Sequence, residues 1–109
     1  MYQFLSCINL KPDQDLNEFR RELHEFAEIL LEKNLLVSMS PVGRRDKHPV
    51  MDTDDERKQE YYFLMTFKDR EQCDQAVEFI YSNEDPGNSV HRNMYKKTRD
   101  QVFICWEEL

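Results

Sequence analysis

With 109 residues, the chain is long enough for one domain built on a single core, without disulfides or metal to hold it together. Its formal net charge of −7 argues against nonspecific binding to nucleic acid or to an anionic membrane, because both need clustered Lys and Arg. No apolar run approaches the roughly 18–20 residues of a membrane span. The N-terminal residues lack the pattern of a secretory signal, so we expect a cytoplasmic protein.

Cysteine and glycine usage argues against bound metal and bound nucleotide. Cys7, Cys73 and Cys105 are widely spaced, without a Cys-x-x-Cys pair and without a histidine at metal-ligand spacing. We expect all three to be reduced and buried as small hydrophobic side chains. Gly43 and Gly87 are the only glycines, which rules out a Gly-rich phosphate-binding loop. The sequence therefore predicts no metal and no cofactor.

The first part of the chain predicts a strand, a helix and a second strand. Residues Met1–Leu10 alternate in a way that indicates a strand with apolar side chains on both faces. The segment Asp15–Asn34 has the period of an amphipathic helix, and either Asp13 or Asp15 can cap its first turn. The apolar positions of this helix are Leu16, Phe19, Leu23, Phe26, Ala27 and Leu30. A strand is expected at Leu35–Arg45, where Pro41 indicates an edge strand or a bulge.

The middle of the chain predicts a loop, a strand and a second helix. Residues 46–59 are polar and mostly charged, and we expect a long, mobile loop that joins two antiparallel strands. Glu60–Phe67 is the clearest strand, again apolar on both faces. Asp69 then caps a helix that ends near Ser82.

The last part predicts a turn at residues 83–88, a short helix at Ser89–Thr98 and a strand at Gln101–Glu107. The whole order is βαββααβ in one domain, residues 1–109. With right-handed crossovers this order gives an α+β, ferredoxin-like fold, in which a four-stranded antiparallel sheet carries its two main helices on one face.

The face of the sheet without helices is apolar whichever way the strands are turned. Its projected area is on the order of 350 Å², which is about the largest apolar patch of an ordinary monomer. A second copy of the chain can cover it with one self-complementary surface, so we predict a homodimer with stacked sheets. This pattern of element order and two-faced strands resembles the dimeric α/β-barrel superfamily. The superfamily includes cofactor-independent monooxygenases, haem-degrading enzymes and stress-responsive proteins, and none of their catalytic motifs can be matched to this sequence.

His91 and Tyr95 are the candidate catalytic residues. They are four residues apart and share one side of the predicted short helix. If that side faces a cavity, an imidazole and a phenol would be available for proton transfer or for polar recognition of a ligand.

Basic and aromatic residues provide candidate ligand contacts. Four positive charges lie within residues 91–99, and two arginines precede the polar loop. These charges either attract a carboxylate or phosphate ligand or form a solvated face that pairs with glutamates. Strand aromatics with polar tips suit either packing or an apolar ligand pocket. The candidate ligand-binding residues are Arg44, Arg45, Arg92, Tyr62 and Trp106.

Three functions stay open at this point. The leading hypothesis is a cytoplasmic homodimer that binds a small organic ligand, neutral or anionic, at or beside the sheet face. The first alternative is a cofactor-independent enzyme of monooxygenase or isomerase type that works through His91 and Tyr95. The second alternative is a regulatory module whose sheet serves protein interaction.

Overall fold

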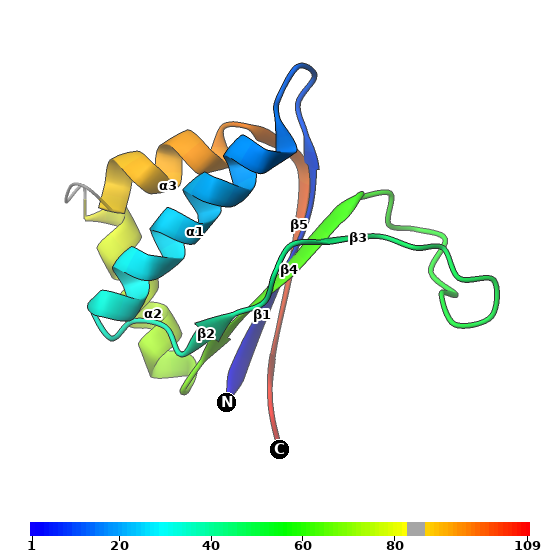
Figure 1. Ribbon diagram of the computed structural model, residues 1–109. Coiled ribbons are helices and arrows are strands. Elements are labelled where there is room, and N and C mark those ends of the chain that lie inside the picture. Colours follow the sequence, from blue (N-terminus) through cyan, green and yellow to red (C-terminus); the bar gives the residue numbers. More distant parts are fainter. Residues whose placement is uncertain (83–86) are drawn as a thin grey trace.

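The computed structural model describes residues 1–82 and 87–109. Its elements are β1 (Tyr2–Leu10), α1 (Leu16–Glu32), β2 (Ser38–Met39), β3 (Gly43–Arg44), β4 (Tyr61–Phe67), α2 (Arg70–Tyr81), α3 (Gly87–Tyr95) and β5 (Thr98–Glu107). One sheet has the strand order β2-β4-β1-β5, and β3 also pairs with β4. The three helices lie together on one side of this sheet (Figure 1). The predicted α+β, ferredoxin-like fold is therefore confirmed.

Capping side chains set where the two long helices begin. The Asp15 carboxylate accepts a hydrogen bond from the N–H of Glu18 at 3.3 Å, and the Asp69 carboxylate accepts one from the N–H of Gln72 at 2.8 Å. Both caps satisfy N–H groups that have no partner inside the helix. No helix in the described part of the chain is long and apolar enough to cross a membrane.

The expected strand at Leu35–Arg45 is divided into β2 and β3, both antiparallel to β4. Pro41 lies between them, and proline has no N–H to donate to a sheet. Because β2 lies at the edge of the sheet, the edge strand that this proline indicated is confirmed, but the strand is also interrupted there.

The short helix and the last strand are both shifted relative to the prediction. Helix α3 ends at Tyr95, where the Thr98 hydroxyl donates to the Tyr95 carbonyl at 2.7 Å. The Lys97 carbonyl then accepts from the Lys11 N–H at 2.8 Å, so the chain enters the sheet at Thr98 instead of Gln101. Most of the turn expected at 83–88 lies outside the described residues.

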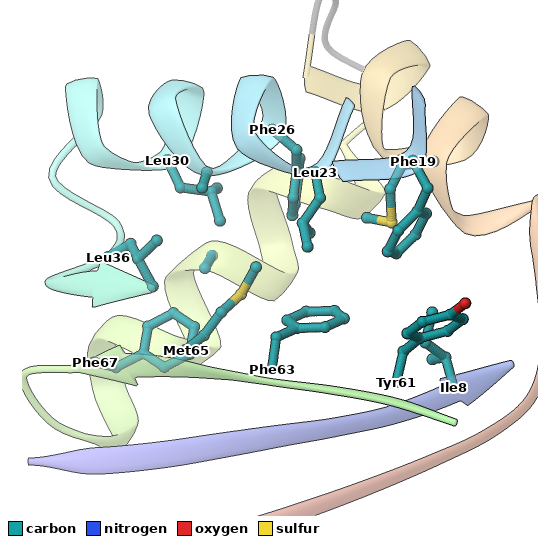
Figure 2. Packing of buried hydrophobic residues seen from close by; sticks show 13 residues of the cluster. Ile8, Phe19, Leu23, Phe26, Leu30, Leu36, Tyr61, Phe63, Met65 and Phe67 are labelled. Carbon is teal, nitrogen blue, oxygen red and sulfur yellow. The ribbon is translucent and has the colours of Figure 1, made fainter. Parts of the chain in front are cut away.

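The core lies between α1 and the sheet. Figure 2 shows the apolar side chains of α1, among them Phe19, Leu23 and Leu30, above those of β4 and β1, with α2 behind. Alternate residues of β4 are buried, as in a strand with one face on the core. The helix-facing residues of β4 are Tyr61, Phe63, Met65 and Phe67.

Strand register settles which side chains occupy the other face, here called the outer face. Because Phe4 pairs with Met65 and Ile8 with Tyr61, the even-numbered residues of β1 point toward the helices and the odd-numbered ones point away. The pairing of Leu5 with Ile104 extends the outer face to β5. The outer face consists of Gln3, Leu5, Cys7, Tyr62, Leu64, Thr66, Val102, Ile104 and Trp106.

The three cysteines differ in burial. All are free; Cys7 is buried and Cys73 is partly buried, but Cys105 is exposed. The expectation that Cys105 is buried is wrong, because β5 is an edge strand in which no residue beyond Thr98 is buried.

Replacing Leu23 with Ala tests the packing of α1. Leu23 is fully buried, so the variant should lose roughly 2–5 kcal/mol of the free energy of unfolding. Leu31→Ala, on the exposed side of the same helix, should lose less than about 1 kcal/mol. Urea unfolding followed by circular dichroism gives both values, and equal losses would contradict this assignment of the core.

Candidate functional site

The middle of the outer face is a band of partly exposed apolar side chains. Leu5 of β1 lies between Leu64 of β4 and Ile104 of β5, and the next row places Cys7 between Tyr62 and Val102. Cys7 is the only fully buried member of the second row, and burial raises the pKa of its thiol. No element of the described chain packs over the first row, because all helices lie on the other side of the sheet (Figure 1).

Polar side chains border this band at the end where the chain begins. The Thr66 hydroxyl donates to Gln3 Oε1 at 2.7 Å, and Gln3 Nε2 donates to Glu108 Oε1 at 2.6 Å.

Polar side chains border the other end as well. Gln59 Nε2 donates to the Asp100 carbonyl at 2.6 Å, and Asn9 Nδ2 donates to Asp100 Oδ2 at 3.1 Å. An apolar centre with hydrogen-bonded polar margins is typical of a protein interface.

Residues 45–60, here called the arm, contain no helix or strand and project from the sheet on the side of the outer face (Figure 1). Arg45 organises the arm. Its guanidinium donates to both carboxylate oxygens of Asp52 at 2.7 and 2.8 Å, to the carbonyls of Asp54 and Arg57, and to the Tyr62 hydroxyl at 3.1 Å. These five bonds use all five N–H groups that an arginine has. The mobility predicted for 46–59 stays a prediction, but the arm has a defined hydrogen-bond network.

The Arg45–Asp52 pair is largely shielded from water, with side-chain exposures of 12% and 19%. Its hydrogen bonds lower the pKa of the Asp52 carboxyl from 3.8 to about 2, because they favour the charged form. The same bonds raise the pKa of Arg45. The pair is therefore charged at every pH at which the protein would normally be handled.

A second partly exposed apolar surface lies on the helix-facing side of β5; we call it the β5 shelf and define it by Tyr2, Phe4, Phe103 and Cys105. The rings of Phe4 and Phe103 stack with centroids 5.3 Å apart. Phe103 is 45% exposed although it points to the side of the helices, since these do not cover the edge strand. A hydrogen bond with Cys105 raises the pKa of the Tyr2 hydroxyl.

Helix α2 borders the β5 shelf. Cys73 on this helix packs against the core cluster, as Tyr2 and Phe4 of the shelf do, and burial raises the pKa of its thiol. Val77 follows one helical turn later and is also exposed. The shelf thus combines stacked aromatic rings with a phenol and two thiols at its margin.

His91 and Tyr95 contact one another in the helix layer. Their ring centroids are 5.7 Å apart, which confirms that they share one side of α3, and His91 lies 5.1 Å from the ring of Phe26 on α1. Burial lowers the pKa of His91. A catalytic role for the two residues stays a prediction.

The structure does not bring the predicted basic residues into one patch. Arg45 lies in the arm and Arg92 on α3, on opposite sides of the sheet (Figure 1). Arg44 pairs with Glu60 at 3.2 Å, and Arg92 donates to Asn88.

Lys97 behaves as expected for a lysine that pairs with glutamates. Its ammonium contacts Glu22 at 2.5 Å and Glu18 at 3.0 Å, both on α1. Burial acts to lower the pKa of Lys97, but its hydrogen bonds to the two carboxylates outweigh burial and the pKa is raised. In residues 1–82 and 87–109, no three His, Cys, Asp or Glu side chains are grouped so as to hold a metal ion.

The residues of the β5 shelf were not among the site residues predicted from the sequence. The signal was present, because Phe103 and Cys105 alternate with Val102, Ile104 and Trp106 in the last strand. An edge strand with two apolar faces next to a single layer of helices leaves both faces partly open. The candidate residues Tyr62 and Trp106 instead lie on the outer face, near its opposite ends.

Solved structures with the same fold include both enzymes and proteins of unknown function. The chain is similar to At3g17210 from Arabidopsis thaliana, with a TM-score of 0.73 and 8% identity over 100% of this chain and 96% of that one. A dimeric ferredoxin-like protein of unknown function from Jannaschia sp. CCS1 has a TM-score of 0.67 and 14% sequence identity, with 98% of each chain covered. SnoaB, a cofactor-independent oxygenase from Streptomyces nogalater, has a TM-score of 0.62 and 6% sequence identity over 99% of this chain and 92% of that one.

These identities show the fold alone. The resemblance to dimeric α/β-barrel proteins is confirmed at that level: the chain has the ferredoxin-like fold of proteins that include a dimer and a cofactor-independent oxygenase. No protein-family model matches the sequence, and the search of curated proteins finds no match either.

Acid should loosen the arm before it unfolds the core. Pairing with Arg45 lowers the pKa of Asp52. The pair therefore stabilises the folded arm fully above pH 3.8, and this stabilisation is lost as the pH falls toward about 2. The Arg45 Nε–H resonance in NMR spectra should therefore broaden or shift over this range. Asp52→Asn should show the loosened arm already at neutral pH. A resonance that is unchanged in both cases would contradict the role given to this pair.

Proposed function

We propose that the protein is a homodimer that binds a small organic ligand on the β5 shelf, beside the sheet. The observation that carries the proposal is the exposure of Phe103, a stacked aromatic ring on the side of the sheet that the helices otherwise bury. Large aromatic side chains that face a layer of helices are normally covered, so a partly open one suits a ligand-binding surface.

The outer face supports the dimer. The first row of its apolar band is partly exposed in a single chain, and side chains at its polar margins are hydrogen-bonded within that chain. A second sheet stacked about 10 Å away would cover the band and leave those margins unchanged. The dimeric ferredoxin-like protein with the same fold supports this arrangement. In this proposal Tyr62 and Trp106 contribute to the interface.

The β5 shelf supports an aromatic or aliphatic ligand with a polar group. The Phe4 and Phe103 rings offer an apolar surface, and the Tyr2 hydroxyl and Cys105 thiol provide donors and acceptors at one end. Residence in the cytoplasm stays a prediction of the sequence.

A cofactor-independent enzyme is the second candidate, because His91 is half-buried and its pKa is lowered. A lowered pKa keeps the imidazole neutral near pH 7, as a general base requires. SnoaB, which shares the fold, is a cofactor-independent oxygenase. This candidate predicts that a compound retained by the protein is converted by the wild type and not by His91→Phe, and equal conversion by both would remove His91 from the reaction.

The proposed interface can be tested with Ile104→Lys. A lysine in the centre of the outer face would place two ammonium groups in an apolar contact, so the variant should be monomeric at micromolar concentration in sedimentation velocity. The control, Leu31→Lys, lies on the exposed side of α1 and should leave the dimer intact. A wild-type monomer, or a dimer that Ile104→Lys leaves unchanged, would contradict the proposal.

The proposed ligand surface can be tested with Nile red, an uncharged dye whose fluorescence rises on apolar surfaces. Phe103→Glu should weaken binding of this probe by about tenfold, because it removes the exposed ring, whereas Phe103→Leu should retain most of it. Both variants should stay dimeric. Binding that is the same in the wild type and in Phe103→Glu would exclude the β5 shelf.

A further inference from the structure

The tip of the arm, Val50 and Met51, is apolar, although the rest of the arm is polar. Val50 is 72% exposed and Met51 is 78% exposed, the highest values among the large apolar side chains apart from Tyr81 and the C-terminal Leu109. A solvated polar loop has no need of two such side chains at its end. Their exposure in a single chain indicates a surface that is covered by something else.

Hydrogen bonds close the turn at the tip, which consists of Val50 and Met51. His48 Nδ1 accepts hydrogen bonds from the N–H groups of Val50 and Met51 at 3.2 and 3.0 Å, and the Asp52 N–H donates to the His48 carbonyl at 3.1 Å. Asp52 is the residue that Arg45 holds, so the turn that carries the two apolar side chains is fixed to the base of the arm.

Several charged side chains of the arm pair with groups inside the arm. Arg57 pairs with Asp54 at 2.9 Å, and Lys47 donates to the Asp54 carbonyl at 2.6 Å and lies 3.5 Å from Asp55. Several polar groups of the arm therefore bind one another, whereas the Val50 and Met51 side chains at its tip are mostly exposed.

The base of the arm is continuous with the outer face. Arg45 donates to the hydroxyl of Tyr62, which belongs to that face, and Gln59 donates to Asp100 at its margin. Figure 1 shows the arm leaving the sheet on the side away from the helices. Anything that covers the outer face must therefore share this space with the arm.

The length of the arm decides what its tip can reach. Sixteen residues, 45–60, that leave the sheet and return can extend up to about 25 Å, since an extended chain spans about 3.3 Å per residue. Stacked sheets are about 10 Å apart, so the arm has enough residues to reach past a second sheet.

We propose that the arm is a clasp between subunits, in which Val50 and Met51 of each copy pack against the second copy of the chain. The inference rests on the proposed homodimer, and it assigns to the arm a role that the sheet contact alone does not require. Two-fold symmetry provides two clasps in each dimer, so every tip residue contributes twice.

The experiment compares the dimer dissociation constants of the wild type, of the double variant Val50→Ser/Met51→Ser and of the control Leu31→Ser, by sedimentation at several concentrations. The double variant should dissociate at least about tenfold more readily, because it loses the apolar contacts of both tips. Leu31→Ser removes an exposed apolar side chain far from the arm and should change the constant by less than about twofold.

A second measurement detects the contact itself. In dimers mixed from ¹³C-methyl-methionine-labelled and unlabelled chains, filtered NMR spectra should show a contact from the Met51 methyl group to protons of the unlabelled copy. A dimer whose Met51 methyl shows contacts only within its own chain, or whose double variant binds like the wild type, overturns the clasp and leaves the proposed homodimer intact. A wild-type monomer overturns both.

Discussion

The strands of this protein are apolar on both faces, while its helices cover only one. This imbalance determines most of what is specific about the molecule. The odd-numbered residues of β4 and the even-numbered residues of β1 meet α1 and form the core, and the opposite parity is left as an apolar band on the outer face. A single chain cannot bury that band, since its remaining segment, the arm, contacts only one end of it.

The position of β5 at the edge of the sheet has a second consequence. Helices that cross over β1 and β4 do not extend over the edge strand, so Phe103 and Cys105 are exposed on the same side of the sheet on which Phe63 and Met65 are buried. The outer face and the β5 shelf therefore have one cause: the helices cover only part of the sheet. We assign the first to a second copy of the chain and the second to a small molecule, because the band spans β4, β1 and β5 whereas the shelf is formed by β1 and β5 alone.

Much of the fold could be predicted from periodicity and capping. Asp15 and Asp69 mark the helix starts that the structure has, and Pro41 marks the interruption between β2 and β3. The parity of the strands could not be predicted, since Tyr61 to Phe67 is apolar at nearly every position, and only pairing with β1 decides which residues meet the helices. For the same reason the alternation in the last strand indicated two apolar faces, but not which of them lies on the side of the helices and forms the β5 shelf.

The role of Arg45 was also beyond the sequence. A run of charged residues predicts a solvated loop. Only the spatial arrangement shows that one guanidinium donates to Asp52, to two carbonyls and to Tyr62. The pairing of His91 with Tyr95, by contrast, followed from a four-residue spacing, which is a local property of a helix.

The measurement that tests the account most directly is native mass spectrometry of the protein as purified from its host, because it reports the oligomer and any retained compound together. We expect twice the chain mass plus the mass of a small organic molecule, and this extra mass should be absent from Phe103→Glu. A dimer of bare chain mass in every preparation would favour an interaction module over a ligand-binding protein. A bare monomer would contradict the central claim that the apolar outer face is an interface.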